Sequence, residues 1–171
     1  QCLVGSEMCI RDSRKYNTAE FLACVERLRR YFPGCALTAD MITGFPGETE
    51  ADQAAAVAFL EQVGFAAVHV FPYSRRPGTK ADAMPEQLSH AVKSARAHEA
   101  QRVADACKQR YLVQQVGQTL PVLFETEHDG SWVGHSDNYC LVRAAGDDLR
   151  GLVKNVKISA VSGQMLVGDL V

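Results

Sequence analysis

Long apolar runs and a strong charge of one sign are both missing from this sequence. The longest uncharged apolar stretches, such as residues 54–60, fall far short of the roughly 18 to 20 residues that cross a bilayer. Eighteen Lys and Arg residues stand against 20 Asp and Glu residues, and this net charge of −2 does not favour nucleic acid or a membrane surface as partner. We therefore expect a cytoplasmic protein without a membrane span, whose partners depend on local motifs.

Closely spaced cysteines are missing too. The six cysteines stand singly, and no two are spaced as C-x-x-C or C-x-x-x-C. A zinc site uses ligands in close pairs, and disulfide scaffolds are smaller and richer in cysteine. We therefore expect reduced thiols, as in cytosolic proteins, and no metal site made by this chain alone.

The apolar content is high enough for a real hydrophobic core. Of the 171 residues, 47% are hydrophobic and 8% aromatic, which excludes the disordered and collagen-like classes. The chain is long enough for one domain, or for part of a domain with a small module, and too short for a complete TIM-type barrel. Residues 1–13 resemble a translated sequencing-adapter tail, so we expect a non-native tail there; a genuine irregular N-terminal arm is the alternative.

The pattern of residues 17–73 predicts alternating helices and strands, the order that is typical of a parallel α/β sheet. Asn17 and Glu20 form a capping-box pattern, which predicts a helix that ends near residue 31. Residues 35–43 and 66–73 are short apolar runs typical of buried strands. Between them Thr49 opens a second helix. This order places the two strands side by side, with the helix outside the sheet.

The predicted secondary structure changes from a long helix to short strands at residues 115–118. A long helix is expected from about Pro85 to Gln115, and we interpret it as a solvated outer helix rather than a partner-binding surface. Its thin apolar stripe comprises Leu88, Val92, Ala95, Val103, Ala106 and Leu112. Beyond Gly117, short runs at 119–126, 131–133, 139–143, 152–158 and 165–171 indicate the strands of a small β-barrel.

Two loops follow the two predicted strands, at the edge of the sheet where ligands bind in α/β proteins. The loop at 40–49 is rich in glycine and leads into a helix whose free N-terminal N–H groups favour anions. The loop at 71–79 carries Arg75 and Arg76, which can hold a carboxylate or phosphate, and Tyr73, which can stack on a ligand. The alternatives are a tight turn with nothing bound for the first loop and a solvent-facing loop for the second.

Both loops carry motifs that resemble those of a known enzyme family. TADMITGFPGETE and HVFPYSRRPGT, followed by a long helix and a small β-barrel, are similar to motifs of the radical S-adenosylmethionine tRNA methylthiotransferases. Arg14-Lys15-Tyr16, VFPYS and GHSDNYCLV look most like the branch that methylthiolates C2 of N6-threonylcarbamoyladenosine at adenosine 37 of tRNA. The resemblance covers residues 14–171.

This resemblance implies an α/β plus β fold. Residues 14–84 would be the C-terminal part of a radical-SAM partial (β/α) barrel, residues 85–116 a long linking helix, and residues 117–171 a TRAM-type, OB-like β-barrel. Such enzymes use S-adenosylmethionine and 4Fe–4S clusters, whose cysteine ligands would precede residue 14 in a full-length parent. We expect this chain to supply a pocket wall and a tRNA clamp and to be inactive alone, in a monomeric parent that binds the anticodon arm of tRNA.

The resemblance also assigns residues to the two ligands. Those expected near S-adenosylmethionine are Asp40, Gly44, Phe45, Pro46, Gly47, Glu48, Thr49, Tyr73 and Ser74. Those expected to contact tRNA are Arg14, Lys15, Arg75, Arg76, Gly78, Thr79, Lys154 and Lys157. No catalytic residue and no metal ligand is expected in this chain.

The predicted barrel has an unusual charge for an RNA-binding module. Residues 115–171 contain four basic and seven acidic residues, a net charge of −3, so tRNA contact is expected to depend on where single basic residues lie. We interpret His128 and His135 as turn and strand-edge residues and Trp132 as part of the barrel core. In the first half of the chain, we interpret His69 as a buried, hydrogen-bonded strand residue.

Three alternatives stay open at this point. The first is the branch of the same family that modifies isopentenyladenosine in tRNA or an aspartate of a ribosomal protein. The second is a non-catalytic RNA-binding adaptor. The third is an α/β metabolic enzyme whose Gly-rich turn binds a phosphate.

Overall fold

The computed structural model describes residues 16–171 of the chain. Residues up to Cys107 belong to one compact unit and Lys108–Val171 form a second, and the division falls inside one long helix. Arg14, Lys15 and the expected tail at 1–13 lie outside the described residues. The predicted domain limits, 14–84, 85–116 and 117–171, stay a prediction. No helix in the described part of the chain is both long and apolar enough to cross a membrane.

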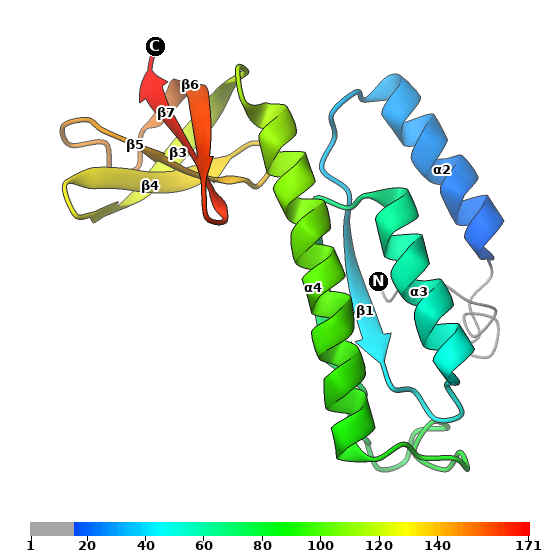
Figure 1. Cartoon of the computed structure of the whole chain (residues 1–171). Coiled ribbons are helices and arrows are strands. Elements are labelled where there is room, and N and C mark those ends of the chain that lie inside the picture. The colour runs from blue at the N-terminus through cyan, green and yellow to red at the C-terminus, as the bar shows by residue number, and fades with distance from the viewer. Residues whose placement is uncertain (1–15) are drawn as a thin grey trace. The chain divides into compact units, whose positions relative to one another are not determined.

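The first unit alternates helices with strands (Figure 1). Its elements are α2 (Thr18–Tyr31), β1 (Thr38–Thr43), α3 (Glu50–Val63), β2 (Ala67–Pro72) and the first part of α4 (His90–Gln115). β1 and β2 are parallel, with Thr38 opposite Ala67 and Thr43 opposite Pro72. The predicted parallel sheet is confirmed, although both strands are shorter than expected. Within residues 16–171 this sheet has two strands, so the larger (β/α) barrel stays an expectation.

Local hydrogen bonds explain where α2 and α3 begin and end. Asn17 and Glu20 form a reciprocal capping box at the start of α2, and Thr49 and Asp52 form another at the start of α3. Gly64 ends α3 in the left-handed conformation, with a φ angle of 64°. These two helices therefore have the limits that the sequence predicts.

The core of the first unit joins one face of the sheet to its helices. Its buried members are Val25, Ala39, Met41, Ala56, Phe59, Leu60, Val63, Phe65, Val68, Ala100 and Ala104. In β2, Val68 belongs to this core, so His69 lies on the opposite face of the sheet and is exposed. The interpretation of His69 as a buried imidazole is therefore wrong, because a position inside a strand does not say which face is covered.

The long helix differs from its prediction in both its start and its buried face. α4 begins at His90, because Glu86 has a φ angle of 61°, which lies outside the helical range. Val92, Ala95 and Ala106 of the predicted stripe are exposed. The buried residues of α4 are Lys93, Arg96, Ala100, Ala104, Cys107, Tyr111, Leu112 and Gln115. The predicted start of the helix and half of its predicted stripe are therefore wrong, since polar residues on the buried face concealed its period.

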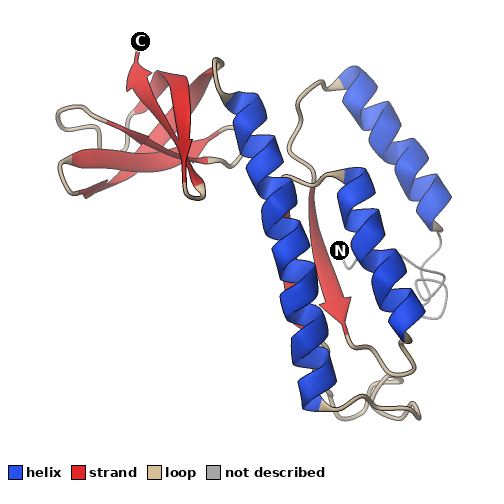
Figure 2. Cartoon of the chain, in the orientation of Figure 1, coloured by secondary structure: helices blue, strands red, loops and turns tan. Residues whose placement is uncertain are grey.

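The second unit comprises the last part of α4 and a closed five-stranded β-barrel that follows it (Figure 2). Its strands are β3 (Thr119–His128), β4 (Ser131–Ser136), β5 (Leu141–Ala144), β6 (Val153–Ser162) and β7 (Met165–Leu170). The order around the barrel is β3-β4-β5-β7-β6, and pairing of β3 with β6 closes it. The predicted small barrel is confirmed, and Trp132, 6% exposed, belongs to its core as predicted.

Two glycines allow the strands of the barrel to coil tightly. The β3–β4 ladder shifts register after Phe124, which pairs with Gly134, and the β6–β7 ladder shifts after Ile158, which pairs with Gly168. A Cβ atom at either glycine would collide with a main-chain carbonyl oxygen of the facing strand. The facing strands therefore approach so closely at both bulges that only glycine fits.

Candidate functional site

The Gly-rich loop after β1 is a turn that its own glutamate closes. Gly44 and Gly47 have φ angles of 71° and 76°, a conformation that favours glycine. The main-chain N–H of Glu48 donates to the carbonyl oxygen of Phe45 at 3.0 Å. The Glu48 carboxylate folds back to accept the N–H of Gly44, at 2.9 and 3.0 Å from its two oxygens, and Glu48 is 5% exposed. This carboxylate therefore anchors the turn.

Arg96 on α4 holds the same turn from a different element. Its guanidinium lies 2.6 Å from the Glu48 carboxylate, donates to the Glu48 carbonyl oxygen at 2.9 Å and reaches the Glu50 carboxylate at 2.6 Å. Burial by itself would lower the pKa of Arg96, but hydrogen bonds to Glu50 and Glu48 outweigh it and raise the pKa above its usual value. Lys93, one turn earlier on α4, fills the space beside Gly44, where a Cβ would lie 2.6 Å from its Cγ.

Two N–H groups at the start of α3 are engaged by side chains of the same turn. The N–H of Asp52 donates to the Thr49 hydroxyl at 3.1 Å, and the N–H of Thr49 donates to the Asp52 carboxylate at 2.9 Å. The N–H of Gln53 donates to the Thr49 carbonyl oxygen at 3.1 Å. The N–H groups of Thr49 and Asp52 are therefore not free for an anion, and Glu50 and Asp52 add negative charge to the first turn of this helix.

A pocket of about 530 Å³ opens at the carboxyl ends of β1 and β2. It is lined by Ile42, Phe71, Pro72, Tyr73, Ser74, Arg76, Thr79 and Ala81. The N–H of Tyr73 donates to the Thr43 carbonyl oxygen at 2.8 Å, and the Tyr73 ring meets Phe45 edge to face at 5.2 Å. The amine of Lys93 lies 4.9 Å from the centre of the same ring. The Tyr73 hydroxyl is buried and has no hydrogen-bond partner within residues 16–171.

The two adjacent arginines of the second loop have different surroundings. Arg75 pairs with Asp82, with its Nε 2.7 Å from the carboxylate and its Nη2 3.1 Å from the main-chain oxygen. Arg76 lines the pocket, and its side chain forms no ion pair with another residue of the described chain. Thr79 supports this loop, because its hydroxyl donates to the Arg76 carbonyl oxygen at 2.8 Å and accepts the N–H of Asp82 at 3.2 Å. The loop therefore holds Arg75 and leaves the Arg76 guanidinium available to a ligand.

The structure brings only some of the predicted site residues together. Tyr73, Ser74, Arg76 and Thr79 line the pocket, and Phe45 touches Tyr73. Gly44, Pro46, Gly47, Glu48 and Thr49 form the neighbouring turn, Asp40 pairs in register with His69 on β2, and Gly78 shapes the second loop with a φ angle of 83°. Lys93 and Arg96 also hold this region, and the sequence analysis did not predict them as site residues. Their spacing of three residues, continued by Ala100 and Ala104, was the available signal.

The predicted tRNA contacts of the barrel lie on β6. Lys154 and Lys157 are both exposed, and the Lys157 amine donates to the Gly117 carbonyl oxygen. His128 lies 3.0 Å from Asp129, the residue that follows it, at the end of β3. His135 lies within β4 rather than at an edge, since it pairs with both Leu123 and Leu141. The interpretation of His135 as a strand-edge residue is therefore wrong, because β4 is paired on both sides.

Within residues 16–171, no group of three or more His, Cys, Asp and Glu side chains is placed to hold a metal ion. Cys24 is exposed, Cys35 is partly buried, and Cys107 and Cys140 are buried. The described residues therefore do not fit a 4Fe–4S cluster, which needs several cysteine ligands at one place.

Curated proteins with similar sequences share one kind of reaction. Threonylcarbamoyladenosine tRNA methylthiotransferase MtaB of Bacillus subtilis is 36% identical over 161 residues, which cover 90% of this chain and 36% of that protein. The tRNA-2-methylthio-N(6)-dimethylallyladenosine synthase of Maricaulis maris is 38% identical over 170 residues, covering 97% of this chain and 37% of the relative. The synthase of the same name from Nitratidesulfovibrio vulgaris is 36% identical over 165 residues, 91% of this chain and 37% of the relative.

The alignments extend over nearly the whole chain. The chain spans little more than a third of the length of these curated relatives, and no protein-family model matches it. The two relatives whose names carry different modified adenosines are about equally similar to it. On this homology, the chain belongs to the radical S-adenosylmethionine tRNA methylthiotransferase family.

Proposed function

We propose that this chain is part of an enzyme that methylthiolates C2 of N6-threonylcarbamoyladenosine at adenosine 37 of tRNA. Its first unit supplies a wall of the site for S-adenosylmethionine and the modified base, as the end of a radical-SAM partial barrel. Its second unit is the TRAM-type barrel, which clamps the anticodon arm of tRNA. The names of the relatives support tRNA as the substrate.

The choice of substrate rests on one observation, the guanidinium of Arg76, which lies in the pocket and is unpaired among the described residues. The threonylcarbamoyl group of the substrate ends in a carboxylate and a hydroxyl, whereas a dimethylallyl group is apolar. Arg76 lines the pocket without an ion pair to any described residue, and Ser74 lines the same pocket. A planar guanidinium binds a carboxylate through two parallel hydrogen bonds, so this end of the pocket suits the threonyl group.

The pocket also bears on the expected cofactor. S-adenosylmethionine, when bound, supplies the radical chemistry of this family. Tyr73 and Ser74 would hold it, and the buried Tyr73 hydroxyl, which has no partner within residues 16–171, fits a polar group of such a ligand. The turn at 44–49 acts indirectly in this proposal, because Glu48 and Arg96 hold the residues that carry Phe45 against Tyr73.

A second candidate rests on the apolar side of the same pocket. Ile42, Phe71, Pro72 and Ala81 offer a wall that suits a dimethylallyl group, the group named in two of the relatives. The phosphate-binding metabolic enzyme is less well supported, because Glu50 and Asp52 place negative charge at the start of α3, where a phosphate would bind.

The test compares anticodon stem-loops that differ only at position 37. Binding of the 171-residue chain is measured by fluorescence anisotropy for adenosine, N6-threonylcarbamoyladenosine, its methyl ester and N6-dimethylallyladenosine at that position. We expect the free carboxylate to bind about tenfold more tightly than the methyl ester, and Arg76→Ala to remove this difference. Arg75→Ala is the matched control and should keep the preference, because Asp82 already engages that guanidinium.

Three other results of the stem-loop experiment would contradict parts of the proposed function. Tighter binding of the dimethylallyl stem-loop, unchanged in Arg76→Ala, would replace the proposed substrate with that of the second candidate. Equal binding of all four stem-loops and of an unrelated hairpin would contradict the tRNA assignment itself. A preference for the free carboxylate that survives Arg76→Ala would place the recognising cation elsewhere.

A further inference from the structure

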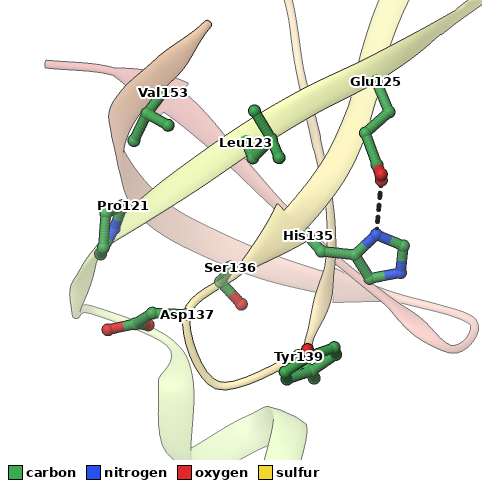
Figure 3. A pocket seen from close by; sticks show the side chains of 8 residues that line it. All are labelled: Pro121, Leu123, Glu125, His135, Ser136, Asp137, Tyr139 and Val153. Carbon is green, nitrogen blue, oxygen red and sulfur yellow. Dashed lines mark hydrogen bonds and ion pairs between the residues drawn. The ribbon is translucent and has the colours of Figure 1, made fainter. Parts of the chain in front are cut away.

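The barrel carries a second pocket, which none of the expected site residues lines. It measures about 550 Å³ and lies between β3, β4, the turn at 137–140 and the start of β6. Its lining residues are Pro121, Leu123, Glu125, His135, Ser136, Asp137, Tyr139 and Val153, all labelled in Figure 3. All of them belong to the second unit, so the pocket is complete within one compact body.

The most unusual residue of this pocket is Tyr139. Its side chain is 86% exposed, and its backbone has a φ angle of 61°, in the left-handed region that a bulky residue rarely adopts. The N–H of Tyr139 donates to the Ser136 carbonyl oxygen at 2.9 Å, and the N–H of Ser136 donates to the Cys140 carbonyl oxygen at 3.0 Å. The turn therefore holds an aromatic ring in solvent at a position where glycine or asparagine would cost less.

A second set of hydrogen bonds makes the turn rigid. The Ser136 hydroxyl donates to the Asn138 side-chain oxygen at 2.6 Å. The amide of Asn138 donates to the Tyr111 hydroxyl at 3.2 Å and to the Gln115 side chain at 3.1 Å, both on the last part of α4. The positions of Asp137 and Tyr139 are therefore preorganised, which lowers the entropy that a ligand has to overcome on binding.

The floor of the pocket is apolar. Leu123 on β3 lies opposite Val153 on β6, and these side chains are 42% and 63% exposed. Pro121, two residues before Leu123, continues the same face of β3. An apolar floor next to an exposed aromatic ring suits a flat ring that stacks on Tyr139.

The walls of the pocket are acidic. Glu125 lies 2.6 Å from Nδ1 of His135, as the dashed line in Figure 3 shows, and Asp137 stands on the turn beside Tyr139. No Lys or Arg is among the residues that line this pocket. Phosphate groups are therefore repelled, while N–H groups of a ligand meet carboxylate acceptors.

We propose that this pocket binds one unpaired RNA base, stacked on the ring of Tyr139, and reads its amino group with the carboxylate of Asp137. The proposal rests on the proposed function, in which the barrel holds tRNA. Cytosine, adenine and guanine carry an exocyclic amino group, whereas uracil presents carbonyl oxygens that this carboxylate repels. The pocket therefore favours amino-bearing bases over uracil, and phosphate contacts are left to residues outside it.

The test uses single-stranded hexanucleotides with the complete 171-residue chain. These oligonucleotides carry no modified base, so the result does not depend on recognition at the Arg76 pocket. We expect oligo(C) and oligo(A) to bind about tenfold more tightly than oligo(U), measured by fluorescence anisotropy. Amide chemical shifts of residues 135–140 should move on titration. Asp137→Asn should reduce the preference over oligo(U), and Asp147→Asn, at an exposed carboxylate outside the pocket, should leave it unchanged.

The decisive variant separates binding from folding. Tyr139→Gly removes the ring and also relieves the left-handed backbone, so the protein should unfold at a higher temperature while its affinity for oligo(C) falls about tenfold. Tyr139→Phe keeps the ring and should keep the affinity. Tyr31→Ala, at an exposed tyrosine of α2, is the matched control and should bind like the parent chain.

Three results would overturn the proposal. Unchanged oligonucleotide affinity in Tyr139→Gly would remove the stacking role. Equal affinity for oligo(C) and oligo(U) would remove the base reading. Binding of a Lys-rich aromatic peptide at residues 135–140, with no binding of any oligonucleotide, would assign the pocket to a protein partner. If the oligonucleotide test and the stem-loop test of the Arg76 pocket both fail, the proposed function is wrong. If only the oligonucleotide test fails, the proposed function stands and the proposal for the barrel pocket is wrong.

Discussion

Arg96 and Glu48 form a buried pair in which one guanidinium binds both the carboxylate and the main-chain carbonyl oxygen of the same residue, at 2.6 and 2.9 Å. The two side chains are 7% and 3% exposed. Because Glu48 also accepts the N–H of Gly44, this pair joins α4 to the turn that follows β1. The shape of the candidate pocket therefore depends on a helix that contributes none of its lining residues.

Breaking this pair should destabilise the first unit strongly. Arg96→Met leaves the Glu48 carboxylate buried without a cation, and we expect it to lower the free energy of unfolding by about 3 to 5 kcal/mol in urea denaturation. Glu50→Gln removes an exposed partner of the same arginine and should cost less than about 1 kcal/mol. A loss below about 1 kcal/mol for Arg96→Met would show that the turn does not depend on the helix.

The two bulge glycines should be intolerant of any side chain. Gly134→Ala and Gly168→Ala each force a methyl group against a main-chain oxygen, so we expect each to cost about 3 kcal/mol. Gly130→Ala is the control for backbone conformation, since Gly130 has a φ angle of 72° and open space around it; it should cost about 1 kcal/mol. Equal losses in all three variants, measured by thermal unfolding, would mean that steric contact is not the cause.

The cysteines should differ in their rates of alkylation. Cys24 is exposed, whereas Cys107 and Cys140 are 1% and 6% exposed. With iodoacetamide, Cys24 should react rapidly in the native protein, and Cys107 and Cys140 should react only after unfolding. Peptide mass spectrometry after timed quenching measures each site. Rapid native labelling of Cys140 would show that the barrel opens often.

Cys140 should also make the stability of the barrel fall at high pH. Burial raises the pKa of the Cys140 thiol above its ordinary value of 9.0, and hydrogen bonding from Ser136 offsets only part of this effect. Above pH 9.0 the unfolded chain therefore loses this proton while the folded chain keeps it, so the free energy of unfolding decreases, by at most about 1.4 kcal/mol per pH unit. Cys140→Ala should show a smaller slope of unfolding free energy against pH than the parent chain. Parallel slopes would contradict the raised pKa.

Salt dependence should separate phosphate contacts from structural cations. If Lys154 and Lys157 contact tRNA phosphates, removing either should reduce the slope of log K against log salt by about one unit. Arg75→Ala should leave the slope unchanged, because its guanidinium is paired with Asp82. Anticodon stem-loop binding at several salt concentrations gives the slopes. Unchanged slopes in both lysine variants would place the phosphate contacts on other residues.

Local sequence was sufficient wherever a structure depends on neighbouring residues. The capping boxes of Asn17 and Thr49 and the left-handed stop at Gly64 predicted two helices correctly, since these hydrogen bonds join residues three or four positions apart. The barrel was also predictable, because its short strands alternate buried and exposed residues between turn residues. Trp132 falls in this alternation and is buried as expected.

Tertiary structure decided what depends on distant partners. The buried face of α4 carries Lys93 and Arg96, whose burial makes sense only beside Tyr73 and Glu48, and no periodicity in hydrophobic residues reveals such a pair. Arg75 and Arg76 are equivalent in the sequence, and Asp82 engages only Arg75. The residues of the barrel pocket come from β3, β4, β6 and the turn after β4, and they lie close together only because the barrel closes by pairing of β3 with β6.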